Sequence, residues 1–279
     1  WEIWHPKTGT QAQGQLKSPR WNHAAVRLPE GEGGYVMLIG GEGLEDGKPV
    51  ALNNFEVIRY DTCGNVARVG KTAITCKMGG TNYCHPAGDP SGLGSDKCQG
   101  LKGQPGYQEI TWEPIVQPLP DSVGRNLPGA VYVAHGAYHY VYIVGGFSDA
   151  ARGKPLDRLD IFDIQQGIWV SNELTLDVAR GAPLVAASMV GSRAGQVLIA
   201  GGIGPDGQTV APAEAVYLAN PGQPAAALQK WPVKTALPGG SVAGLAFPLA
   251  TGHILLTGGA SRNADGMSPQ TTVLLWNPL

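Results

Sequence analysis

Four times in this chain a short apolar run ends in two consecutive glycines and then gives way to a polar turn. The first glycines of the pairs are separated by 105, 56 and 57 residues, so the period is about 57 residues and the first spacing holds an insert. Similarity at a fixed period is the sequence signature of repeat architectures. The pattern therefore predicts four copies of one structural unit, each organised around its diglycine: Gly40 and Gly41, Gly145 and Gly146, Gly201 and Gly202, Gly258 and Gly259.

Each repeat is predicted to consist of four short strands. A tight-turn signal such as Asp46-Gly47 or Asp206-Gly207 follows each diglycine, where glycine supplies the positive φ that a hairpin turn needs. A second extended run then ends on a pair such as Phe162-Asp163, and the middle repeats add a third run that contains Trp169 or Trp231. One more apolar run precedes each diglycine strand. No segment has a sustained 3.6-residue apolar period, so the expected fold is all-β.

The two ends of the chain suggest how the units close. The fourth repeat reaches Asn277 without a tryptophan-bearing fourth strand, whereas residues 1–4 have the aromatic, β-prone character of the strand that is missing. Pairing of the N-terminal strand with the last unit would close a ring and remove its open sheet edges. The sequence thus predicts one domain over residues 1–279, a four-bladed β-propeller. The expected blades are residues 20–116, 125–172, 180–234, and 238–279 together with 1–6.

These residues resemble the kelch-type repeat. The resemblance rests on the diglycines together with Tyr60, Phe162, Trp169, Trp231 and Trp276, and it covers almost the whole chain. Similarity to this family also implies an arginine near the start of the first strand of each blade. Arg20, Arg125 and Arg180 stand 20, 20 and 21 residues before their diglycines, but residues 237–238 of the fourth repeat hold no arginine. Kelch-type propellers usually have five to seven blades, so a count of four departs from the family and leaves open that the chain is part of a larger ring.

Composition narrows the class of partner. The chain has 41 glycines and 22 prolines among 279 residues, and its formal net charge is −2. This charge gives no electrostatic footprint for nucleic acid, and no apolar run is long enough to span a bilayer.

All four cysteines lie in the insert of the first blade, expected at residues 63–107. This segment is poor in core residues, and Cys63, Cys76, Cys84 and Cys98 are expected to form two disulfides that take the place of a core. The alternative is a metal site that includes His85 beside Cys84, but the spacings contain no C-x-x-C knuckle. Disulfides predict an extracytoplasmic chain, secreted, periplasmic or at the cell surface, from which a signal segment has been removed.

The sequence offers little catalytic chemistry. It has no G-x-S-x-G elbow, P-loop or H-E-x-x-H motif, and its histidines are not arranged as a metal triad, so no catalytic residue, metal or cofactor is expected. The candidate binding residues are Arg20, His23, Arg125 and Arg180, which could present guanidinium groups at one mouth of the ring to a carboxylate or sulfate. The alternative is that each arginine bonds backbone carbonyls or an acidic neighbour and so ties adjacent blades together.

The expected function is therefore that of a non-catalytic binding or scaffold protein whose partner is another protein in a larger envelope or extracellular assembly. Its contact surface would be the insert and the turns that follow the diglycines, at residues 42–54, 147–158, 203–214 and 260–271. A carbohydrate-active enzyme or lectin that binds a small anionic or glycan ligand at the arginine-lined mouth is one alternative. A metal or haem carrier that resembles hemopexin is another.

Overall fold

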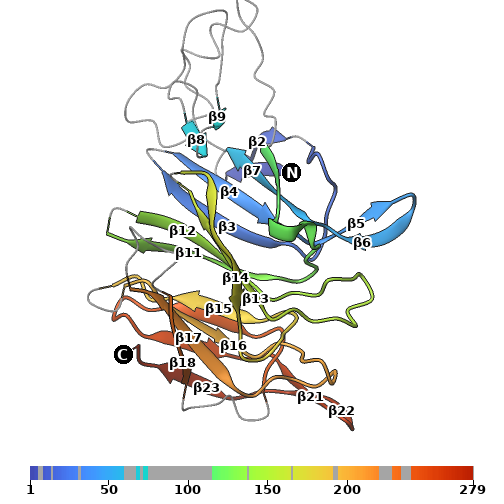
Figure 1. The fold of residues 1–279 in the computed structure, drawn as a ribbon, viewed down its shortest axis with the longest axis vertical. Helices are drawn as coiled ribbons and strands as arrows, with labels where there is room; N and C mark the ends of the chain where they lie inside the picture. The colour runs from blue at the N-terminus through green and yellow to red at the C-terminus, as the bar shows by residue number, and fades with distance from the viewer. Residues whose placement is uncertain are drawn as a thin grey trace, which may run out of the picture.

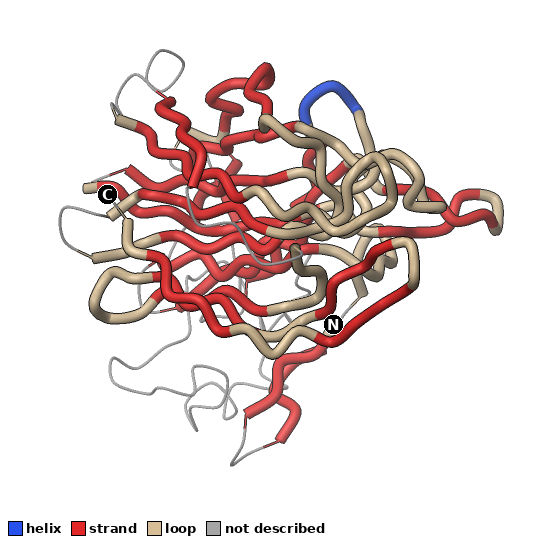
Figure 2. Tube along the Cα trace, turned by 90° about the horizontal axis from the view of Figure 1, so that it is seen from below, coloured by secondary structure: helices blue, strands red, loops and turns tan. Residues whose placement is uncertain are grey.

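The computed structural model describes residues 1–5, 9–13, 15–30, 33–59, 67–69, 72–74, 115–136, 138–164, 166–190, 194–219, 228–233 and 240–278. These residues form antiparallel β-sheets, and their one helical turn is the short 3-10 helix η1 (Pro120–Ser122) (Figure 2). The all-β prediction is confirmed. Within the described ranges, no helix has the length and apolar character needed to cross a membrane.

Four larger sheets hold most of the strands. The first has the order β10-β7-β4-β3, and the second and third follow the chain as β11-β12-β13-β14 and β15-β16-β17-β18. The fourth has three strands in the order β19-β20-β23. Their bounds are β3 Ala24–Glu30, β4 Gly33–Ile39, β7 Asn54–Arg59, β10 Ile115–Pro118, β11 Gly129–His135, β12 Tyr138–Val144, β13 Arg158–Asp163, β14 Ile168–Thr175, β15 Leu184–Ala187, β16 Gln196–Ala200, β17 Ala213–Leu218, β18 Leu228–Val233, β19 Leu245–Pro248, β20 Ile254–Thr257 and β23 Val273–Trp276.

The four sheets are stacked in chain order along the long axis of the molecule (Figure 1). Their first strands contact one another in sequence, β3 with β11, β11 with β15 and β15 with β19. Alternate residues of each strand point to opposite faces of its sheet, so a sheet inside the stack must be apolar on both faces. This requirement explains the near-continuous apolar runs of the second strands, such as YHYVYIV in β12.

Three apolar cores lie between consecutive sheets. The first joins Met37 and Phe55 of the first sheet to Phe162 and Trp169 of the second, where the Phe55 and Phe162 rings meet edge to face with centroids 5.1 Å apart. The second core lies between the second and third sheets and the third lies between the third and fourth. The tryptophan of the second repeat therefore packs against the preceding sheet.

Small hairpins extend from this stack. Strands β5 (Glu42–Glu45) and β6 (Lys48–Ala51) form one after the first diglycine, turning at Asp46 and Gly47 with φ of 50° and 74°. Two positive φ values are the geometry of a type I′ turn, as the Asp-Gly signal predicts. Strands β21 (Ala260–Asn263) and β22 (Gly266–Pro269) form the corresponding hairpin after the fourth diglycine.

The predicted closure by the N-terminus is wrong. Strand β1 (Glu2–His5) pairs with β2 (Gly9–Gln13) in a separate two-stranded sheet, and β23 has no fourth strand beside it among the described residues. The N-terminus lies beside the first sheet, at the opposite end of the stack from β23 (Figure 1). A nearby hairpin partner, eight residues from β1 or fewer, competes better than a distant one because a short loop costs less entropy to close.

The insert lies between the third and fourth strands of the first sheet, as expected. Strand β10 pairs with β7 and follows the insert, a few residues later than the expected strand around Trp112. Within the insert, β8 (Ala67–Val69) pairs with β9 (Thr72–Ile74) and does not join the sheet. The four cysteines predicted to form disulfides lie outside the described residues.

Candidate functional site

The three candidate arginines lie at the start of a four-residue turn that leads into the first strand of each sheet. These leading turns are residues 20–23, 125–128, 180–183 and, in the fourth repeat, 241–244. Their third residues all have a positive φ of 51° to 58°, a backbone feature that the four turns share. Arg20 is 9% exposed, and Arg125 and Arg180 are fully buried. The guanidinium groups are therefore not presented to solvent.

Each arginine is paired with a carboxylate on the third strand of its own sheet. Arg20 contacts Glu56 at 2.5 Å, Arg180 contacts Glu214 at 2.6 Å, and Arg125 contacts Asp160. Burial lowers the pKa of Arg20 and Arg180, and the hydrogen-bonded carboxylates oppose that shift. A buried charge is tolerated only when it is paired and its donors are satisfied.

A second nitrogen of each guanidinium, Nη1, donates to the backbone carbonyl of the first glycine of its diglycine. Nη1 of Arg20 donates to the Gly40 carbonyl at 2.8 Å, and Nη1 of Arg125 and Arg180 donate to Gly145 and Gly201 at 3.2 Å each. Every arginine thus connects the start of the first strand of its sheet to the end of the second strand and to the third strand. This geometry supports the alternative that each arginine bonds backbone carbonyls and an acidic neighbour, but these bonds lie within one sheet and do not tie adjacent sheets together.

The second glycine of each of the first three pairs binds the next sheet. The N–H of Gly41 donates to the carbonyl of Arg125 at 2.7 Å, and Gly146 donates to Arg180 at 3.0 Å. Gly202 makes the same bond to Ser241 at 2.7 Å. Each of the first three diglycines therefore links two consecutive repeats. The carbonyl of its first glycine accepts from its own leading turn, and the N–H of its second glycine donates to the following leading turn.

Close approach explains why glycine is needed at the first position. A Cβ on Gly40 would lie 2.3 Å from the Arg125 carbonyl oxygen, and one on Gly145 would lie 2.2 Å from that of Arg180. Both glycines also have a positive φ, which is strained for other residues. At these two positions glycine is required by the contact between sheets as well as by the positive φ.

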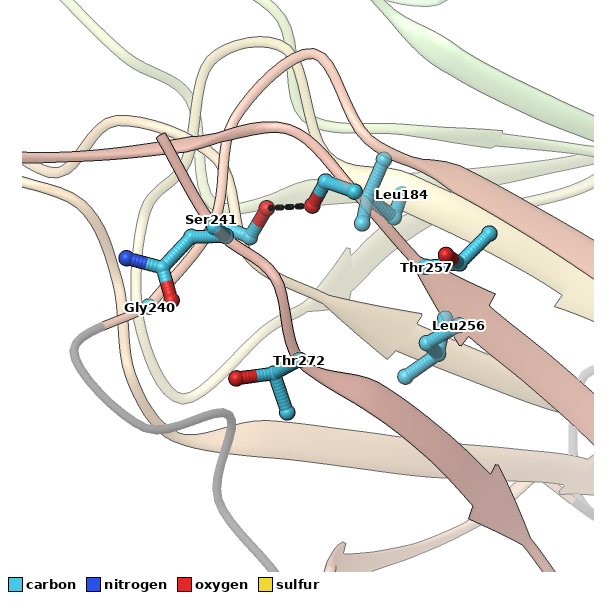
Figure 3. A pocket seen from close by; sticks show the side chains of 8 residues that line it. Leu184, Gly240, Ser241, Leu256, Thr257 and Thr272 are labelled. Atoms are coloured by element: carbon cyan, nitrogen blue, oxygen red, sulfur yellow. Dashed lines mark hydrogen bonds between the residues drawn. The ribbon is translucent and has the colours of Figure 1, made fainter. Parts of the chain in front are cut away.

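The fourth repeat replaces both members of the ion pair with uncharged residues. Ser241 occupies the first position of its leading turn, and its hydroxyl donates to the Gly258 carbonyl at 3.1 Å (Figure 3). Leu274 takes the place of the acid, because it pairs with the residue two before the diglycine, as Glu56 and Glu214 do. A small pocket lined by Ser241, Leu256, Thr257 and Thr272 lies beside this hydroxyl.

His23 stands apart from the arginines in its environment. Burial, and to a lesser extent the charge of Arg20, lowers the pKa of its imidazole. Its Nδ1 is buried and has no hydrogen-bond partner among the described residues. Among those residues, no group of three or more histidine, cysteine, aspartate or glutamate side chains could hold a metal ion.

Sequence analysis missed the three acids. Glu56, Asp160 and Glu214 follow the second glycine of their pairs by 15, 14 and 12 residues, a spacing loose enough to escape notice beside the arginine spacing. The detectable signal was a carboxylate inside an apolar strand, as in NFEVIR and RLDIFD. A charge at such a position needs a buried partner.

The loops that follow the diglycines gather on one side of the stack. We call residues 42–54, 147–158, 203–214 and 260–271 the diglycine loops; they extend from the same side in Figure 1. Neighbouring loops contact each other, since Arg152 lies 3.8 Å from Glu42, and the N–H of Thr209 donates to the carbonyl of Arg262 at 3.1 Å. Leu44 and Met267, in the first and last loops, are 64% and 57% exposed.

No protein-family model and no curated protein matches this sequence. Solved structures match its fold. One of YjhT is 13% identical with a TM-score of 0.53, and it is matched over 93% of this chain and 68% of its own. A chain from a cryo-EM structure of RAG in complex with one melted RSS and one unmelted RSS is 10% identical with a TM-score of 0.51, over 93% and 67%. The likeness therefore covers nearly all of this chain and about two thirds of each neighbour.

Proposed function

We propose that this chain is a non-catalytic scaffold that binds another protein through its diglycine loops. The observation that carries the proposal is that four loops from four sheets gather on one side of the stack and that the first and last of them expose apolar side chains, Leu44 and Met267. Recognition residues are commonly carried by loops on a rigid scaffold, and exposed apolar groups beside polar ones favour a protein partner.

The four larger sheets are proposed to be blades of a kelch-type propeller. The support is the repeated unit of leading turn, diglycine and buried arginine-carboxylate pair, which occurs three times and has a neutral counterpart in the fourth repeat. The extracytoplasmic location stays a proposal that rests on the four clustered cysteines.

A small anionic or glycan ligand at the arginines has less support. Each guanidinium already binds a carboxylate of the protein and a diglycine carbonyl, so an external anion would have to displace a buried internal one. Breaking such a pair is costly, on the order of 3–5 kcal/mol. The fourth repeat, which has no arginine at this place, offers no cation to such a ligand.

The test is site-specific photo-crosslinking in the native host. A photoreactive residue at Leu44 and another at Met267 should capture the same partner protein, because both lie among the diglycine loops. Tyr138 is the matched control: it is 37% exposed but lies at the other end of its strand, seven residues before the diglycine. Equal capture from Tyr138, or different proteins from Leu44 and Met267, would overturn the proposal.

A further inference from the structure

The outer face of the fourth sheet, which points away from the third sheet, is a largely apolar surface. It consists of two rows of residues paired across the strands. One row is Leu245, Thr257 and Val273, and the other is Phe247, Leu255 and Leu275. Leu245, Phe247, Val273 and Leu275 are 45% to 61% exposed. The opposite face of the same sheet, which carries Leu256 and Leu274, packs in the third core.

The same positions are buried in the first sheet. There the corresponding rows are Ala24, Ile39 and Phe55, and Val26, Met37 and Val57, and the second of these rows is at most 5% exposed. They pack against the second sheet in the first core. The exposed rows of the fourth sheet therefore have the composition and register of a surface that elsewhere in this molecule is covered by the next sheet.

The backbone of the fourth diglycine also lacks the neighbour that the other three diglycines have. Gly258 has φ of 70°, like the first glycine of the other pairs, yet no described atom lies within 4 Å of where its Cβ would be. At Gly40, Gly145 and Gly201 that space holds the carbonyl oxygen of the following leading turn, 2.1 to 2.3 Å from the same point. This feature is independent of side-chain hydrophobicity and marks the place of a specific backbone carbonyl.

We propose that the outer face of the fourth sheet seats a fifth sheet of the same repeat type, whose leading turn places its first carbonyl against Gly258 and Gly259. The occupant that we propose is an antiparallel sheet with an apolar face, preceded by a leading turn that begins with arginine, as in the first three repeats. The face continues a series of three like interfaces, and it carries no ionisable side chain that would attract a charged ligand. The inference goes beyond the proposed function, because it concerns a different side of the molecule.

The lengths of the structural neighbours fit this proposal. Each match covers 93% of this chain but only about two thirds of the neighbour, so the unmatched third of each neighbour has room for two more sheets of the same size. The described residues also contain no strand beside β23, so a fifth sheet would be preceded by a fourth strand for the fourth sheet.

The chain supplies its own probe for a test. Residues 164–233 follow the Phe162-Asp163 pair and provide a fourth strand, the Arg180 turn and the complete third sheet. A second copy of this segment, joined after Asn277 of the otherwise intact chain, should place a fifth sheet on the fourth. We expect amide hydrogen exchange in β20 to slow by about tenfold or more relative to the unextended chain, because the covered sheet opens less readily.

Two variants of the extended chain keep the test specific. Leu275→Lys should abolish the added protection by placing a charge in the interface, and Gly258→Ala should reduce it by blocking the carbonyl. Ile168→Lys is the matched control and should leave the protection intact, since Ile168 is 50% exposed on the second sheet, away from the fourth.

Three results would overturn the proposal. One is an extended chain in which β20 exchanges as fast as in the unextended chain while the added sheet is itself folded. Another is protection that survives Leu275→Lys. The third is an unextended chain that already protects β20 by dimerising in analytical ultracentrifugation, which would make a second copy of the fourth sheet the occupant.

Discussion

The buried arginines of this chain are each held by several partners. Arg180 is fully buried and satisfied by Glu214 and two carbonyls, Gly201 at 3.2 Å and Pro212 at 3.1 Å. The fourth repeat solves the same structural problem with Ser241 and Leu274. A pair of this kind can be exchanged as a unit, because removal of one partner leaves an unpaired buried charge, whereas removal of both does not.

This difference can be measured in the third repeat. Glu214→Leu alone should destabilise the chain by about 3–5 kcal/mol, since it strands the Arg180 guanidinium. The double variant Arg180→Ser with Glu214→Leu should lose clearly less, because it reproduces the residues of the fourth repeat. Urea unfolding of the two variants and the parent would check this. A double variant at least as unstable as Glu214→Leu would contradict the argument.

His23 gives the molecule a pH-dependent contribution to stability. Its pKa is lowered in the folded state by burial and by Arg20, so the unfolded chain binds a proton more readily than the folded one below about pH 6.5. Stability should therefore fall as the pH drops through the window between about 6.5 and the lower folded-state pKa. In His23→Gln this part of the pH dependence should disappear, as thermal unfolding measured from pH 7.5 to 5 would show. Identical pH profiles for the variant and the parent would exclude His23 as the source.

At the scale of the single element, the diglycines differ in what surrounds them. Gly145→Ala should cost more than about 3 kcal/mol, because its Cβ would overlap the Arg180 carbonyl at 2.2 Å in addition to the strain of a positive φ. Gly258→Ala should cost only the strain, about 1–2 kcal/mol, since its Cβ meets no described atom. Chemical denaturation of both variants provides the comparison, and equal losses would show that the carbonyl contact is unimportant.

The elements were largely predictable from the sequence, and their long-range pairing was not. The diglycines fix the end of each second strand, and the Asp46-Gly47 signal gives the correct turn, since both features are determined within a few residues. Strand β1 could pair with the nearby β2 or with the distant β23. The sequence analysis favoured the distant partner only because residues 1–4 resemble the tryptophan-bearing strand that the fourth repeat lacks. The role of the arginines stayed open because their acid partners lie 34 to 36 residues away.

At the scale of the whole molecule, positions that are equivalent in two sheets should differ in their tolerance to substitution. A position on a face covered by the next sheet should tolerate a charged residue less well than the same position on the uncovered face of the fourth sheet. Ile161 in the second sheet and Leu275 in the fourth lie in the same register, three residues before the diglycine on the paired strand, but they are 0% and 59% exposed. Ile161→Lys should therefore destabilise the chain by about 4 kcal/mol or more, because it buries an unpaired charge, whereas Leu275→Lys should stay within about 0.5 kcal/mol. Denaturant unfolding separates the two, and a severe loss for Leu275→Lys in the unextended chain would mean that the fourth sheet is already covered in solution.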